Sequence, residues 1–176
     1  RVVGLDANDP FVYGQLAKTK DIEEKRNIDQ IGGAEKAHQL YDDYQVGTTL
    51  AGKAVSWIKM HKDEPFFLYF PTTNIHHPFT PHTRFQGTSE AGRYGDFVHE
   101  LDWIVGEVTR TLEEEGLADN TLIVYIGDHG AQFSRGKTSV YDAGARIPLI
   151  VHWPGQVKGG LVREELVSVT DILPTF

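Results

Sequence analysis

The chain has 176 residues, of which 40% are hydrophobic and 11% aromatic, and this is enough to bury a substantial core in one globular domain. A formal net charge of -8 excludes a general nucleic-acid-binding surface, because phosphate binding needs a dense positive footprint. No apolar run approaches the roughly 18 residues of a membrane helix, so we expect no membrane-spanning segment. The absence of cysteine excludes disulfides and thiolate metal sites.

The first third of the chain has the weakest secondary-structure signal. Residues 1–35 mix charged residues with Gly and Asn and contain Asp9-Pro10, which predicts surface loop with room for one short helix. The sequence starts at Arg1 without a methionine and stops at Phe176, within a segment typical of a helix start. It contains no internal repeat and no low-complexity tract. We expect one structural unit that is truncated at both ends.

Two long amphipathic helices are predicted. Apolar residues recur at helical spacing over residues 45–61, with basic residues at the C-terminal end, where the helix dipole favours them. The second helix covers residues 95–115, and Gly116 is expected to end it.

Three short strands are predicted from apolar runs, over residues 66–70, 121–127 and 148–153. The run at residues 66–70 is apolar throughout, which is typical of a strand buried on both faces. Because strands and helices alternate along the chain, we expect an α/β fold with a parallel sheet.

Metal-ligand side chains follow the second of these strands directly, at Asp128 and His129. Open α/β sheets place their ligands at the carboxyl ends of parallel strands, and a carboxylate with an imidazole suits a cation that accepts mixed ligands. The alternatives are that Asp128 caps a helix or forms an Asx-turn and that His129 is an ordinary loop histidine.

A second group of chemistry-bearing residues follows the first predicted strand. His76, His77 and Pro78 would place imidazoles at the same sheet edge as Asp128. Histidine can contact an anionic oxygen and can protonate a leaving oxygen near neutral pH. The alternative is a solvent-exposed loop histidine, which is also our interpretation of His82.

Gly136 and Lys137 lie a few residues beyond the Asp128-His129 pair. A lysine is a compact cation for an anionic oxygen, and glycine lets the backbone approach closely. The alternative is a solvated surface lysine. The wider spacing of a phosphate-binding P-loop is absent from the sequence.

Taken in order, these elements resemble the sulfatase family within the alkaline-phosphatase-like superfamily, most closely the arylsulfatase branch that uses formylglycine. The matching elements, spread over residues 48–176, are Phe-Phe-Leu-Tyr, His-x-Pro, Tyr-Gly-Asp-Phe-Val-x-Glu-Leu-Asp-Trp, Asn-Thr, Asp-His-Gly, Gly-Lys, Gly-x-Arg-x-Pro and Trp-Pro-Gly. The resemblance implies a partial three-layer α/β sandwich with a mostly parallel central sheet. Residues 1–176 would be the central to C-terminal part of one catalytic domain.

The resemblance implies a calcium-dependent sulfate-ester hydrolase in which a hydrated formylglycine attacks sulfur. Asp128 matches the metal-binding aspartate, and His129 falls where many members have asparagine and some have histidine. His76 matches the histidine that contacts the sulfate and the leaving oxygen, while His77 is at the variable position. Lys137 matches the sulfate-binding lysine. A sulfated small molecule or sulfated glycan is the implied substrate, and a periplasmic, secreted or lysosomal location is the implied compartment.

The chain also departs from the family pattern. It lacks the Cys-x-Pro-Ser-Arg or Cys-x-Ala-Ser-Arg element from which formylglycine is made, as well as the N-terminal paired aspartates. Asp42-Asp43 is interpreted as surface charge, Asp102 and Trp103 as structural, and Arg146 as packing or a buried ion pair. We therefore expect this polypeptide alone to be inactive.

Two alternatives stay open at this point. The first is a phosphodiesterase or phosphonate monoester hydrolase of the same superfamily, since an Asp-His metal pair is compatible with either reaction. The second is a catalytically inert binding or structural module. The residue at the nucleophile position, outside this sequence, would separate the two hydrolases.

Overall fold

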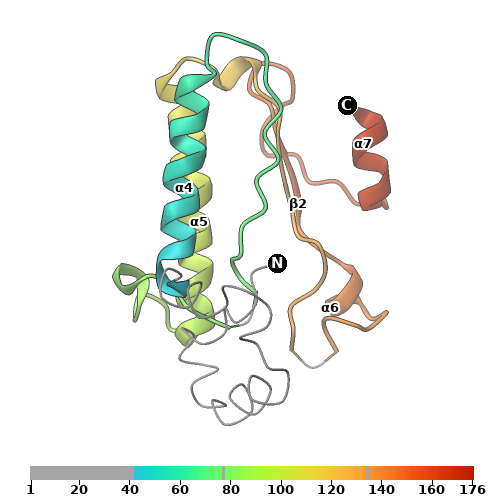
Figure 1. Cartoon of the computed structure of the whole chain (residues 1–176). Coiled ribbons are helices and arrows are strands. Elements are labelled where there is room, and N and C mark those ends of the chain that lie inside the picture. Colours follow the sequence, from blue (N-terminus) through green and yellow to red (C-terminus); the bar gives the residue numbers. More distant parts are fainter. Residues whose placement is uncertain (1–41, 77, 134) are drawn as a thin grey trace, which may run out of the picture. The chain divides into compact units, whose positions relative to one another are not determined.

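The computed structural model describes residues 42–76, 78–133 and 135–176. It divides into two compact units, Arg1–Thr111 and Leu112–Phe176, and each is described by itself. The predicted loop over residues 1–35 lies outside the described residues, as does His77. Figure 1 shows the course of the chain.

The first long helix of the described chain is α4 (Asp43–Met60), close to the predicted span. Asp42 is its N-cap and accepts a hydrogen bond from the Tyr44 N–H at 3.0 Å, which satisfies one of the free donors of the first turn. Asp42 thus caps a helix, a role more specific than surface charge. The buried face of α4 is formed mostly by small residues, namely Gly47, Ala51, Ala54 and Ile58.

Helix α5 (Gly92–Glu114) is the second predicted helix. It runs in the same direction as α4 in Figure 1, and the close approach of Gly47 to the Glu100 carboxylate shows that the two helices are in contact. Its buried face includes Phe97 and Ile104, which complete the core of this unit with the small residues of α4. At its end Gly116 has a φ of 71°, and the Leu117 N–H donates to the Leu112 carbonyl at 2.8 Å. This is a Schellman ending, so the predicted stop at Gly116 is confirmed.

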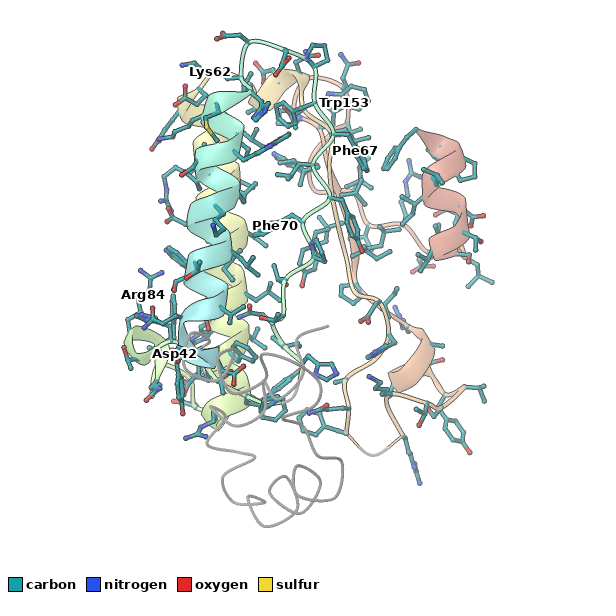
Figure 2. The ribbon with its side chains drawn as sticks, in the orientation of Figure 1. Asp42, Lys62, Phe67, Phe70, Arg84 and Trp153 are labelled. Atoms are coloured by element: carbon teal, nitrogen blue, oxygen red, sulfur yellow. The ribbon has the colours of Figure 1, made fainter. Side chains whose placement is uncertain are left out.

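Residues 66–70 were predicted to form a strand, but they pair with no described strand. Their side chains alternate in exposure, and Phe67 is 74% exposed whereas Phe70 lines a shallow groove with Leu50 of α4. Figure 2 shows these two phenylalanines on the segment. The expected burial on both faces is therefore wrong for the described chain.

The second unit contains a two-stranded sheet of β1 (Ile123–Ile126) and β2 (Leu149–His152). The strands were located correctly, but they pair antiparallel, with Ile123 opposite His152 and Ile126 opposite Leu149. A parallel pair needs a long crossover, usually through a helix. The connection here contains only the four-residue helix α6 (Asp142–Ala145) among its described residues, so the chain simply returns beside β1.

The described C-terminus consists of a turn of 3-10 helix, Val169–Asp171, followed by α7 (Ile172–Thr175). Ser168 forms a capping box with Asp171, which fits the helix start predicted there. The combination of long helices with a sheet agrees with the predicted α/β class. Among residues 42–76, 78–133 and 135–176, no helix is both long and apolar enough to cross a membrane.

Candidate functional site

The connection between β1 and β2 folds back on itself through backbone contacts. The Gly127 N–H donates to the Pro148 carbonyl at 3.1 Å, and the Gly130 N–H donates to the Gly144 carbonyl at 2.9 Å. A Cβ atom at position 130 would collide with the Ala143 carbonyl oxygen. Glycine is therefore required here for close backbone approach, and this approach fixes where the residues after β1 lie.

Asp128 and His129 meet at the start of this loop. Oδ2 of Asp128 lies 3.2 Å from Nε2 of His129, and Oδ1 accepts a hydrogen bond from the His129 N–H at 2.9 Å. The Nδ1 atom of His129 lies 2.9 Å from the Gly130 carbonyl oxygen. Because the Asp128 side chain is 86% exposed and the His129 side chain 37% exposed, both are accessible to a ligand.

This geometry fits a divalent cation. Two donors bound at right angles to one cation at about 2.0–2.4 Å lie about 3 Å apart, close to the Oδ2–Nε2 separation. A neutral His129 that donates its Nδ1–H to the Gly130 carbonyl keeps a lone pair on Nε2, as metal-bound histidines do. Within the described residues no three His, Cys, Asp or Glu side chains form a metal-binding group, so the pair can be only part of a ligand set.

Lys137 belongs to the same loop. Its backbone N–H donates to the Ala131 carbonyl at 2.8 Å, and a Cβ atom on the preceding Gly136 would collide with that same carbonyl oxygen. Residues 135 and 138 both have positive φ, and the Ser139 hydroxyl donates to the Arg135 carbonyl at 2.6 Å. The half-buried Lys137 side chain forms no ion pair with any residue that the structure describes.

His76 lies in the first unit, on a turn after the extended segment. Its N–H donates to the Thr73 carbonyl at 3.0 Å, the Thr72 hydroxyl donates to the Asn74 carbonyl at 3.2 Å, and the His76 side chain is exposed. The structure thus brings Asp128 and His129 together and puts Lys137 on their loop. The meeting of His76 with those three residues stays a prediction, because they belong to different units.

Arg146 and Trp103, both interpreted from the sequence as structural residues, differ in their exposure. Arg146 is exposed at the C-terminal end of α6, which contradicts the buried ion pair, one of the two interpretations that we gave for it. Trp103 is half-buried, and the Arg84 guanidinium lies 3.6 Å from the centre of its ring, as a cation–π contact. Figure 2 shows Arg84 on the short turn that precedes α5. Trp103 is thus part of a structural contact, as predicted.

Glu100 was missed by the sequence analysis. It is 1% exposed on α5, and its Oε2 accepts a hydrogen bond from the His82 N–H at 3.1 Å. Burial raises its pKa, while the His82 N–H, the Asn74 amide and the charge of Arg84 oppose that rise. The available signal was its spacing, three residues after Phe97 and four before Ile104, which puts a carboxylate on the apolar face of the helix.

A comparison with protein families shows which family the chain belongs to. Residues 10–176 match the family model described as sulfatase. The chain belongs to the sulfatase family. An N-acetylgalactosamine-6-O-sulfatase from Bacteroides thetaiotaomicron is 36% identical to this sulfatase chain, over 99% of the chain and 42% of the relative. The steryl-sulfatase of Rattus norvegicus is 35% identical over 72% of the chain and 25% of the relative.

A solved structure agrees with this assignment. A Bacteroides thetaiotaomicron sulfatase described with the metabolism of multiple glycosaminoglycans superposes with a TM-score of 0.63 and 40% identity, over 67% of this chain and 29% of that one. The likeness confirms the alkaline-phosphatase-like α/β fold expected of a sulfatase. The chain spans less than half the length of the relatives that it matches. Sulfatases generally depend on a metal and on formylglycine.

Proposed function

We propose that the protein hydrolyses sulfate esters and that the sulfate is carried by a glycan. The observation that carries this proposal is the Asp128–His129 pair, whose Oδ2 and Nε2 atoms lie 3.2 Å apart on a loop shared with Lys137, in a chain of the sulfatase family. A carboxylate and an imidazole suit a cation, and an ammonium on the same loop suits the anion that the cation would help to bind.

Lys137 and His76 act on different oxygens of the substrate. In the transition state, negative charge develops on the bridging oxygen and is spread over the non-bridging sulfate oxygens. The Lys137 ammonium binds a non-bridging oxygen and stabilises that charge. The His76 imidazolium gives its proton to the bridging oxygen as the S–O bond breaks, so that the alcohol leaves neutral.

The proposed reaction also needs two groups that are not assigned to residues of this chain, namely a metal cation and a nucleophile. When bound, a divalent cation, which we expect to be calcium, would supply Lewis-acid chemistry to a sulfate oxygen, and a formylglycine would supply the nucleophile, as the family implies. Asp128 and His129 are the residues that would hold the cation. The 176 residues include no cysteine, so no residue of this chain is assigned the nucleophile's role.

The substrate class follows from the relatives. The relative that covers 99% of the chain is named an N-acetylgalactosamine-6-O-sulfatase, and the solved structure is described with glycosaminoglycan metabolism. We therefore propose a 6-O-sulfated amino sugar in a glycan as the first substrate to test. Sulfated steroids are the contrasting class, because a steryl-sulfatase is also similar to the chain.

The test uses the natural protein with calcium. Release of sulfate is measured from 4-nitrophenyl sulfate, N-acetylgalactosamine 6-sulfate and a steryl sulfate, and release of phosphate from 4-nitrophenyl phosphate. We expect sulfate release, with the amino-sugar sulfate preferred over the steryl sulfate. Faster phosphate release would overturn the proposed reaction, and a preference for the steryl sulfate would overturn the proposed substrate.

The residue assignments are tested by substitution. Lys137→Ala should lower kcat/KM by about 100-fold or more, and His76→Ala should lower it by about 100-fold on the sugar sulfate. The exposed residues Lys158 and His152 supply matched controls, as Lys158→Ala and His152→Ala. Full activity of either site variant would remove that residue from the site.

A further inference from the structure

A buried polar cluster lies beneath the turn that carries His76. Glu100 on α5 is 1% exposed, and its Oε1 atom and both amide atoms of Asn74 are buried with no hydrogen-bond partner in the part of the chain that the structure describes. The Asn74 amide is still near enough to favour the charged form of Glu100, although the pair falls short of hydrogen-bond geometry. Buried polar atoms in this state cost stability, so the cluster needs an explanation.

Gly47 of α4 leaves the space that this cluster occupies. A Cβ atom at Gly47 would collide with Glu100 Oε1 and would lie 3.1 Å from Asn74 Oδ1. The two oxygens therefore face the same point on α4, and only glycine leaves room for them. An apolar side chain at position 100 would have filled an ordinary helix interface without any orphaned oxygen.

The two residues that Glu100 faces lie on either side of His76 in the sequence. Asn74 precedes His76 by two residues, and His82, whose N–H donates to Glu100 Oε2 at 3.1 Å, follows it by six. Thr80 and Pro81, between these two points, are also buried. The Glu100 carboxylate thus bonds the His82 end of the segment that carries His76, and it lies beside the Asn74 end at Gly47 of α4.

We propose that Glu100 is a positioning residue for the sulfatase site, which fixes the turn carrying His76 without touching the substrate. The proposal rests on the proposed function, in which His76 protonates the leaving oxygen. Displacement of the acid lowers the turnover of substrates with poor leaving groups, such as sugar sulfates, far more than the turnover of 4-nitrophenyl sulfate, whose leaving group departs without a proton. Loss of folded protein lowers the activity on both substrates by the same factor.

The experiment compares kcat on the two substrates in the natural protein. Glu100→Leu should lower kcat on the sugar sulfate at least about tenfold more than on 4-nitrophenyl sulfate, and His76→Ala should show the same selective loss. Glu100→Gln keeps an acceptor for the His82 N–H and should change the ratio less than about threefold. Thr111→Val is the matched control, because Thr111 is a buried polar residue elsewhere on α5 whose hydroxyl donates to the Glu107 carbonyl of the same helix.

Equal losses on both substrates in a folded Glu100→Leu variant would overturn the proposal. If that variant does not fold, Asn74→Ala takes its place, with the same selective loss expected and the same equal loss contradicting it. Amide hydrogen exchange gives a readout that needs no activity. The His82 amide should lose protection in the Glu100 variant while the amides of β1 do not, and unchanged His82 protection would also overturn the proposal. Absence of sulfatase activity in the natural protein would instead count against the proposed function alone.

Discussion

The Nε2 atom of His129 lies 3.2 Å from Oδ2 of Asp128, so the side chains of two adjacent residues meet instead of diverging. Successive side chains in an extended strand point to opposite faces, which keeps them apart. The chain leaves the strand geometry of β1 after Ile126, and this change lets both side chains reach one point. A cation held there would be bound by consecutive residues of one loop.

The first prediction concerns this cation. Addition of calcium to the metal-free natural protein should raise its Tm in a concentration-dependent way, by an amount equivalent to about 2.7 kcal/mol at one hundred times Kd. Asp128→Asn and His129→Ala should each reduce this rise, because each removes a ligand. Thermal unfolding at several calcium concentrations measures it, with the exposed Asp119 changed to Asn as control. An undiminished calcium response in Asp128→Asn would show that the cation binds elsewhere.

The second prediction concerns the glycines of the loop that carries Lys137. Gly136→Ala should destabilise the protein by about 1–3 kcal/mol, because the new Cβ atom meets the Ala131 carbonyl oxygen, and it should raise KM by moving Lys137. Gly106→Ala is the control, since nothing lies within 4 Å of a Cβ atom there. It should stabilise α5 by about 0.5–1 kcal/mol. Urea unfolding and steady-state kinetics measure the two effects, and a neutral Gly136→Ala would contradict the close approach.

The third prediction concerns Asp96, which ties α5 to the turn before it. Its carboxylate accepts hydrogen bonds from the Gly87 N–H at 2.9 Å and the Ser89 N–H at 2.8 Å. Asp96→Ala should cost about 1 kcal/mol for each lost bond. Asp102→Ala, at an exposed position of the same helix, should cost much less. Equal unfolding free energies for the two variants would show that these bonds contribute nothing.

The same carboxylate predicts a pH dependence. Burial alone would raise the pKa of Asp96, but the backbone N–H groups of residues 87–89 and the nearby His99 hold it below its ordinary value of 3.8. Its stabilising contribution is therefore present above pH 3.8 and is lost as the pH falls through the lower, folded-state pKa. Urea unfolding of the natural protein and of Asp96→Ala should converge in that acidic range. A constant difference down to low pH would contradict the lowered pKa.

The fourth prediction concerns Glu100, whose pKa burial raises above its ordinary value of 4.5. Below pH 4.5 the carboxyl is protonated in both the folded and the unfolded chain. Above pH 4.5 the unfolded chain ionises before the folded chain does. The free energy of unfolding therefore falls as the pH rises toward and through the folded pKa. Glu100→Gln should therefore gain stability relative to the natural protein as the pH rises above 4.5, measured by urea unfolding. Glu113→Gln, at an exposed position of α5, should show no such trend.

Much of the helical structure could be predicted from the sequence. The apolar periodicity located α4 and α5 within a few residues, and Gly116 marked the end of α5 because only its positive φ permits that ending. The positions of β1 and β2 were also predicted. Their antiparallel pairing was not, because an apolar run shows where a strand lies but not which strand it pairs with.

The candidate site was predicted in part. Asp128 and His129 were predicted because ligand-type residues follow an apolar strand, and their side chains meet in the structure. Lys137 was predicted from the Gly-Lys element on the loop that follows, and its role stays a prediction. Glu100 escaped notice because a glutamate on a helix is usually solvated, and its burial depends on Gly47 of a different helix. A contact between two helices leaves no local pattern in the sequence of either one.

Backbone hydrogen bonds and close backbone contacts at Gly130, Gly136 and Gly144 fix the shape of the loop between β1 and β2. Its most exposed apolar side chains, Val140 and Tyr141, contribute little to its shape. Saturation mutagenesis should therefore show that Gly130, Gly136 and Gly144 tolerate almost no replacement, whereas the exposed positions 140 and 141 tolerate most. Such a loop could acquire new substrate contacts by single substitutions while its cation-binding end stays in place.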